Sequence, residues 1–148
     1  MKRALVVVGL CAYLAVLWQV VLTPGGGADG PQPASNLVPF ASLLEQLDGN
    51  APLKHRVYFL AGNLLMFTPP VVLTWIGWPR VRLGAVLLAT VLTSGTIEVT
   101  QHVAITGRAG DIDDVILNTV GAAAATLLLT TFSRRPAPES TSAVAASQ

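Results

Sequence analysis

Residues 96–121 read TIEVTQHVAITGRAGDIDDVILNTVG. Polar and charged side chains here stand between two stretches that otherwise have the composition of membrane-spanning helices. Glu98 and Asn118 fall inside the apolar flanks, and Arg108 and the aspartates lie between them. A charged group at membrane depth costs roughly 2.5–3.5 kcal/mol on insertion scales, and such groups usually mark functional sites. We therefore expect any polar ligand or any chemistry to be located here.

The chain of 148 residues is too apolar for an ordinary soluble domain. Charged residues make up only 11% of it, whereas a soluble domain usually has about 25%. The apolar residues are concentrated in long windows, each close to the roughly 20 residues that a helix needs to cross the bilayer core. The composition therefore indicates an all-α integral membrane protein. A net charge of +1 gives no reason to expect nucleic-acid binding, and the single Cys11 cannot form an internal disulfide.

Four apolar windows are long enough to cross a membrane, at about residues 4–22, 57–78, 83–105 and 115–132. We expect them to form a four-helix membrane bundle. The pair Pro69-Pro70 removes two backbone donors from the second helix, which should be kinked there. The basic residues before the first window also fit a signal peptide, but the window is long for one, and we favour an uncleaved helix.

The connection between the first two windows contains a candidate short amphipathic helix. Pro39 can open it, and apolar side chains then recur at helical spacing, at Phe40, Leu43, Leu44 and Leu47. This pattern suits a helix lying on the membrane surface, and it equally suits a helix that caps the core of the bundle. Both interpretations stay open.

The distribution of lysine and arginine predicts that both termini are cytoplasmic. With the N-terminus inside, the cytoplasmic segments hold six basic residues: Lys2, Arg3, Arg80, Arg82, Arg134 and Arg135. The opposite segments hold three: Lys54, Arg56 and Arg108. The polar turn is then at the outer face of the membrane. The transmembrane domain is expected to end at residue 135, and the tail of residues 136–148, rich in Pro, Ser and Ala, is predicted to be disordered.

Helical spacing divides the polar residues of the opening stretch into two faces. Glu98 and Gln101 are three residues apart and share one face of the third window. Asp111, Asp114 and Asn118 share one face of the fourth helix if that helix begins just after Asp111. The two faces are joined by a short turn, so we expect them to meet.

Folding alone can explain some of these residues. Asp111 suits the N-cap of the fourth helix, and Asp113 and Asp114 suit the positive end of its dipole. Glu98 caps nothing and needs a partner inside the bundle. Arg108 is the natural counter-ion, because a guanidinium can pair with two carboxylates. A purely structural salt-bridge latch of this kind is one interpretation of the cluster.

The other interpretation is an outward-facing polar pocket that binds a ligand. Two asparagines from preceding segments supply further inward polar groups. The candidate ligand-binding residues are Asn36, Asn63, Glu98, Gln101, Arg108, Asp111, Asp114 and Asn118.

The same residues raise the question of metal binding and catalysis. Carboxylates suit Mg²⁺ or Ca²⁺, but their spacing lacks a calcium-loop signature, and we predict no metal and no cofactor. Glu98 or Asp111 could serve as a general acid or base in a membrane hydrolase or transferase. No serine or cysteine nucleophile motif accompanies them. The sequence leaves the enzyme question undecided and leans against an enzyme.

Several polar motifs recur in a familiar order and spacing. They are Asn36-Leu-Val-Pro39-Phe40, Asn63-Leu-Leu-Met-Phe67-x-Pro69, Glu98-x-x-Gln101, and Gly107-Arg108-x-x-Asp111-x-Asp113-Asp114-x-x-x-Asn118-x-x-Gly121. Together they resemble the VanZ-like family of small bacterial membrane proteins, over about residues 4–132. The chain departs from the family at Pro69-Pro70, where a glycine tends to follow the first proline.

The resemblance implies a multi-pass protein of the bacterial plasma membrane that belongs to the cell envelope. The family takes its name from a protein associated with resistance to the glycopeptide antibiotic teicoplanin, so the resemblance also implies a link to antibiotic resistance. It does not imply a reaction. The ligand expected for the pocket is the headgroup of a membrane lipid or of a lipid-linked cell-wall precursor. A structural scaffold and a membrane-embedded enzyme are the alternatives.

Overall fold

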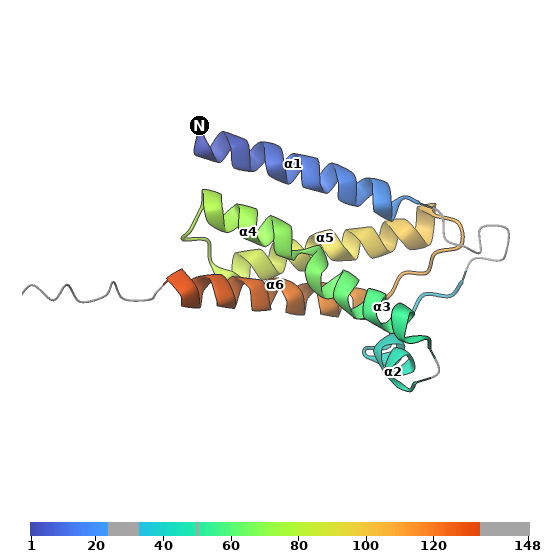
Figure 1. Cartoon of the computed structure of the whole chain (residues 1–148). Coiled ribbons are helices and arrows are strands. Elements are labelled where there is room, and N and C mark those ends of the chain that lie inside the picture. Colours follow the sequence, from blue (N-terminus) through green and yellow to red (C-terminus); the bar gives the residue numbers. More distant parts are fainter. Residues whose placement is uncertain (24–32, 50, 134–148) are drawn as a thin grey trace, which may run out of the picture.

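The computed structural model describes residues 1–23, 33–49 and 51–133, and within these ranges the chain is helical (Figure 1). The helices are α1 (Lys2–Val21), α2 (Ala41–Leu47), α3 (Leu53–Met66), α4 (Thr68–Gly77), α5 (Leu83–Ala104) and α6 (Ile112–Ser133). In the described ranges, the only β-type pairing is an isolated parallel bridge between Asn36 and Asp111. The predicted tail of residues 136–148 lies outside the described residues.

Four helical segments are long and apolar enough to cross a membrane: Lys2–Val21, Leu53–Gly77, Leu83–Ala104 and Ile112–Ser133. The all-α, four-span prediction is therefore confirmed. The second segment begins four residues before the predicted Val57, and the fourth begins at Ile112, ahead of Val115. The hydropathy pattern left these first turns out of the predicted spans, because they carry charged residues. Charged side chains are nevertheless stable at helix ends, where lysine and arginine reach the interface and aspartates face the positive end of the dipole.

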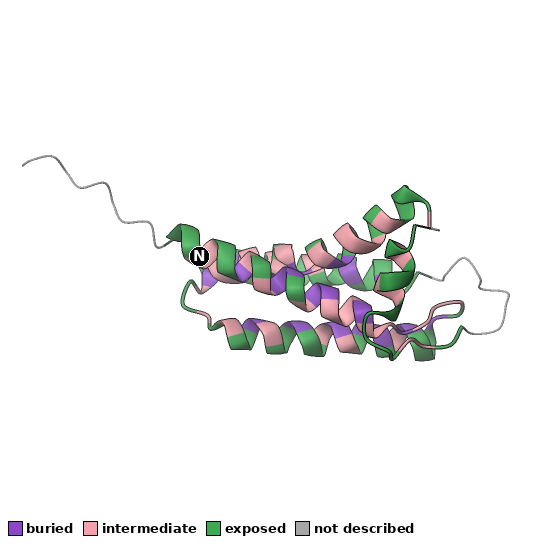
Figure 2. Cartoon of the chain, turned by 90° about the horizontal axis from the view of Figure 1, so that it is seen from below, coloured by how far each residue is buried: buried purple, intermediate pink, exposed green. Residues whose placement is uncertain are grey.

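The spans carry apolar side chains outward and several polar side chains inward. Leu88, Leu92 and Leu128 are exposed, whereas Ser94 and Thr126 are among the most deeply buried side chains. Buried residues follow the faces where the helices meet (Figure 2). Soluble proteins bury large aliphatic residues and expose polar ones. An apolar outer surface together with polar side chains inside suits a bundle surrounded by hydrocarbon.

The second span is broken between α3 and α4, as the proline pair predicts (Figure 1). Pro70 has no backbone N–H, so the Met66 carbonyl has no helical donor four residues ahead. The Tyr13 hydroxyl of α1 donates a hydrogen bond to this carbonyl. Phe67 ends α3 and precedes α4, and the regular helical bonds resume with the Val71 amide donating to the Phe67 carbonyl at 3.1 Å.

Helix α6 packs against α5, α3 and α4, whereas α1 packs on α4. The apolar core that joins them contains Leu17, Val21, Phe67, Val71, Val86, Ile97 and Ala122. Gly121 lets the backbones of α6 and α3 touch, because a Cβ at this position would lie only 1.9 Å from the Leu64 carbonyl oxygen. Close approach through glycine is typical of membrane helix pairs. It brings the first turns of α6 alongside α3.

Candidate functional site

The polar residues gather at one end of the bundle. We call this the polar end: residues 33–49, the turn of residues 105–111 and the first turn of α6. Asn36 links its parts. The Asn36 amide donates to the Gly110 carbonyl at 2.9 Å, and the Ile112 amide donates to the Asn36 carbonyl at 3.0 Å. The Asn36 side chain donates to Ser42 Oγ and to Asp111 Oδ1, both at 2.9 Å. Asn36 therefore fixes the first loop onto the start of α6.

Asp111 is the N-cap of α6, as the sequence predicted. Its Oδ1 accepts a hydrogen bond from the Asp113 amide at 2.9 Å. Its own amide donates to Glu98 Oε2, also at 2.9 Å. Gly110 packs against α5 just before it, and a Cβ there would lie 3.0 Å from the Glu98 carbonyl oxygen. The buried Glu98 therefore has a partner on the turn that begins α6.

Asp113 belongs to α6, but its side chain binds the start of α2. Its side chain is only 1% exposed, and its two carboxylate oxygens accept hydrogen bonds from the Phe40 and Leu43 amides. These amides belong to the N-terminal end of α2, where backbone donors have no intrahelical partner. Phe40, whose amide makes one of these bonds, has a left-handed φ of 68°. Asp113 also lies in the first turn of α6, as expected.

Two asparagines make hydrogen bonds deeper in the bundle. Asn63 of α3 donates to Asp114 Oδ1 at 2.6 Å. Asn118 of α6 is 1% exposed and donates to Ser94 Oγ of α5 at 2.8 Å. The Asn118 Oδ1 atom is buried with no hydrogen-bond partner. These two pairs tie α6 to α3 and to α5, so the amides act between helices.

Arg108 is half-buried on the turn before α6. Its guanidinium interacts electrostatically with the carboxyl groups of Glu98 and Asp114. Gly107 supports this turn with a φ of 75°, a conformation that glycine adopts easily. Gln101 is buried on α5, one turn after Glu98. The turn therefore carries its cation near two of the acids.

A cavity of about 380 Å³ lies at the polar end, between α5, α6 and the first loop. We call it the Glu98 cavity; its lining residues are Ser35, Leu37, Gly95, Glu98, Val99, His102, Gly110, Asp111, Ile112 and Val115. Of the eight residues predicted to form one pocket, Glu98 and Asp111 line this cavity. Among the described residues, the other six are not part of its lining. Four of the six make hydrogen bonds between segments of the chain instead: Asn36, Asn63, Asp114 and Asn118.

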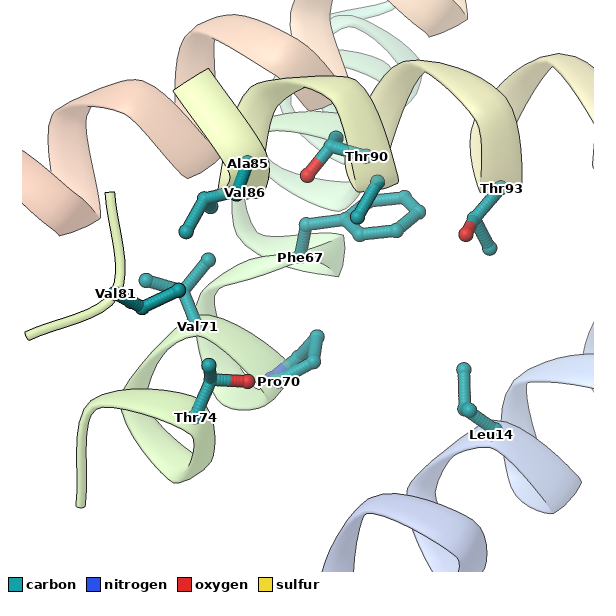
Figure 3. Close-up of a pocket in the computed structure, with 11 residues that line it drawn as sticks. Leu14, Phe67, Pro70, Val71, Thr74, Val81, Ala85, Val86, Thr90 and Thr93 are labelled. Carbon is teal, nitrogen blue, oxygen red and sulfur yellow. The ribbon is translucent and has the colours of Figure 1, made fainter. Parts of the chain in front are cut away.

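A second cavity, of about 250 Å³, lies among α1, α4 and the first half of α5 (Figure 3). Its walls are mostly apolar and include Phe67, Pro70, Val71 and Val86, with Leu14 of α1 facing them across the space. The threonines Thr74, Thr90 and Thr93 are its polar lining residues. This cavity could not be predicted from the sequence, because its walls have the composition of any membrane helix.

A family model described as VanZ/LLP1 matches residues 6–133, which include the residues of the polar end and nearly all of the four spans. The chain belongs to the VanZ/LLP1 family. No curated protein and no solved structure matches it. In this VanZ/LLP1 chain, the motifs that carry the resemblance contact one another: Asn36 and Glu98 both bond to Asp111, and Asn63 bonds to Asp114.

The carboxylates of the VanZ/LLP1 polar end serve mainly as hydrogen-bond acceptors. Asp111 accepts a hydrogen bond from the Asp113 backbone amide, and Asp113 accepts one from the Phe40 backbone amide. Asp114 accepts a hydrogen bond from the Asn63 side chain, and Glu98 accepts one from the Asp111 backbone amide. Within residues 1–23, 33–49 and 51–133, no group of three His, Cys, Asp or Glu side chains converges in a way that could hold a metal ion.

Proposed function

We propose that this VanZ/LLP1 family member is a multi-pass protein of the bacterial plasma membrane that binds the polar headgroup of a lipid or of a lipid-linked cell-wall precursor. The observation that carries the proposal is the Glu98 cavity, where two carboxylates lie in the wall of an otherwise largely apolar hollow. Sites for small molecules usually combine apolar walls with a few placed polar groups. An amphiphile offers the matching surface, because it joins hydrogen-bond donors to a hydrocarbon chain.

The proposal gives the polar residues two roles. Glu98 and Asp111 line the cavity and accept hydrogen bonds from hydroxyl or ammonium groups of the headgroup. Arg108, on the adjoining turn, contacts the phosphate group of the headgroup while it still interacts with the nearby acids, since a guanidinium binds phosphate through two parallel hydrogen bonds. The remaining candidates are positioning residues that hold the helices and the first loop in place around the site: Asn36, Asn63, Gln101, Asp114 and Asn118.

We also propose that the polar end faces outward and that both termini are cytoplasmic. Arg3 lies over the Trp78 ring, with 6.0 Å from Cζ to the ring centroid, so the start of α1 and the turn after α4 are at the same end of the bundle. That end carries Lys2, Arg3, Arg80 and Arg82, whereas the polar end and the start of α3 carry Lys54, Arg56 and Arg108. Basic residues favour the cytoplasmic side.

Ligand binding can be tested with the full-length protein reconstituted in nanodiscs that contain a defined lipid mixture. Native mass spectrometry then reports which lipids remain bound. Glu98→Gln keeps the size of the side chain and removes its charge, and Glu45→Gln makes the same change on α2, at a residue that does not line the cavity. We expect retained lipid to fall at least several-fold in Glu98→Gln and to stay unchanged in Glu45→Gln. Equal retention in both variants, with unchanged thermal unfolding, would contradict the proposal.

A structural scaffold is the second candidate, because most polar side chains at the polar end already bond to one another. In that case, Glu98 and Arg108 serve only as a latch. Exchanging the two charges in one protein should then restore the stability that each single change removes. If the site binds a ligand, the exchanged protein recovers its stability and still fails to retain lipid. Lipid retention in the exchanged protein, measured beside its stability, therefore distinguishes the two functions.

The link to teicoplanin resistance is a further part of the proposal, and it is supported by the family alone. It is tested by expressing the wild-type protein, Glu98→Gln and Glu45→Gln at equal levels in a susceptible host. We expect the wild-type and Glu45→Gln proteins to raise the inhibitory concentration of teicoplanin and Glu98→Gln not to raise it. If the wild-type protein does not raise the inhibitory concentration of teicoplanin, the resistance link is contradicted. The proposal of lipid binding is unaffected by that result.

A further inference from the structure

Helix α2 and the residues just before it form an apolar surface outside the bundle. Its members, Leu37, Val38, Phe40, Leu44 and Leu47, are all more than half exposed, with Leu37 76% and Leu44 64% exposed. Helix α2 has no buried residue. The interpretation in which this helix caps the apolar core is therefore not supported by its packing. We call these five residues the α2 face.

The α2 face is held in a fixed place. Asp113 accepts hydrogen bonds from the Phe40 and Leu43 amides, and Asn36 Nδ2 donates to Ser42 Oγ. The half-buried side of the helix includes Ser42, whereas Leu44 points away from the bundle. The views in Figures 1 and 2 show α2 lying across the end of the bundle, with its axis crosswise to the spans. A helix in this attitude runs along the membrane plane.

The level of the membrane surface at this end is marked by the start of the second span. Lys54 and Tyr58 are exposed at the beginning of α3, with the Lys54 Nζ 5.7 Å from the centre of the Tyr58 ring. Tyrosine and lysine side chains favour the interface between hydrocarbon and water. Helix α2 ends at Leu47, only a few residues before Lys54. Helix α2 therefore ends close in sequence to the start of the second span.

We infer that the α2 face is a membrane-surface anchor that inserts into the headgroup region of the bilayer beside the polar end. The helix is amphipathic: the exposed Glu45 lies on the side turned away from Leu47 and remains in water. Such helices bury their apolar face roughly 5–10 Å into the boundary between headgroups and acyl chains. Leu37 belongs both to this face and to the wall of the Glu98 cavity. The anchor thus sets one wall of the cavity at headgroup depth, whether or not the cavity binds a ligand.

The anchor is tested by spin labels on the full-length protein in vesicles of phosphatidylethanolamine and phosphatidylglycerol. In a Cys11→Ser background, a single label is placed by Leu44→Cys, by Leu47→Cys or by the neighbouring control Glu45→Cys. Collisions with oxygen, which concentrates in lipid, are compared with collisions with a nickel chelate, which stays in water. We expect the ratio of oxygen to nickel collisions to be several-fold higher at positions 44 and 47 than at position 45.

Equal ratios at the three positions, with nickel collisions as frequent as for a label in water, would overturn the inference. Labels at positions 44 and 47 that neither reagent reaches would place the face against protein, as in a dimer, and would overturn it as well. Thermal unfolding of each labelled protein is measured beside the wild type. Positions 44 and 47 report on the same face, so if one labelled variant folds poorly, the other still tests the inference.

Discussion

The Tyr13 hydroxyl donates a hydrogen bond to the Met66 carbonyl, the group whose helical donor is missing because residue 70 is proline. Within a membrane, water does not replace a lost backbone donor, so a kinked helix needs a side chain or a neighbouring helix to do so. Tyr13 therefore has a definite role in the fold: it satisfies the kink and docks α1 against the second span.

This relationship predicts that Tyr13→Phe destabilises the protein, because it leaves the Met66 carbonyl unsatisfied. The expected cost is about 1–3 kcal/mol in the free energy of unfolding. Reversible unfolding in mixed micelles measures it, with Tyr58→Phe as the control at an exposed tyrosine. In a Pro70→Ala background, which restores an N–H at residue 70, Tyr13→Phe should cost much less. An equal cost in both backgrounds would show that the hydroxyl acts elsewhere.

Gly121→Ala should be strongly destabilising, since the added methyl group would meet the Leu64 carbonyl oxygen at 1.9 Å. Overpacking of this kind costs about 1–3 kcal/mol, and more where backbone must move. Gly84→Ala is the matched control in α5, because no atom outside its own helix backbone lies within 4 Å of a Cβ there. We expect Gly84→Ala to be neutral or slightly stabilising in the same unfolding measurement. Similar losses in both variants would contradict the close packing of α3 and α6.

Asp113→Ala should release α2 while the spans remain folded. The change leaves the Phe40 and Leu43 amides without their carboxylate acceptor. Loss of a helix cap usually costs about 0.5–2 kcal/mol. Hydrogen exchange followed by mass spectrometry should show faster exchange in residues 40–47 and unchanged exchange in α5. Glu45→Ala, an exposed acid on α2 itself, is the control; unaltered exchange in Asp113→Ala would refute this capping role.

The sequence predicted the parts of the fold that depend on composition and local pattern. The four spans follow from apolar length, the break from Pro69-Pro70, and the N-cap from an aspartate directly before Ile112. The second and fourth spans were predicted too short, without their first turns, because a hydropathy window ends where charged residues begin. The family was also predicted correctly from motifs whose members the fold then brings into contact.

The site could be predicted only in part, because its geometry depends on which helices meet. Glu98 was recognised as a charge inside an apolar window and Asp111 as a helix N-cap, but nothing in the sequence shows that they share a cavity. Asp113 was assigned to its own helix, since spacing cannot reveal that its carboxylate reaches the amides of α2. Tyr13 was missed for the same reason. A tyrosine inside an apolar window, together with a proline pair in the next one, was the available signal.

A photocrosslink from inside the Glu98 cavity tests most directly whether this cavity selects a lipid headgroup. A photoreactive amino acid replaces Val99, which lines the cavity, or Val91, an exposed residue of α5 that does not line it. After illumination in bacterial membranes, mass spectrometry identifies the attached lipids. We predict one headgroup class enriched at position 99, lost in Glu98→Gln, and bulk membrane lipids at position 91. The same bulk lipids at both positions would contradict the claim.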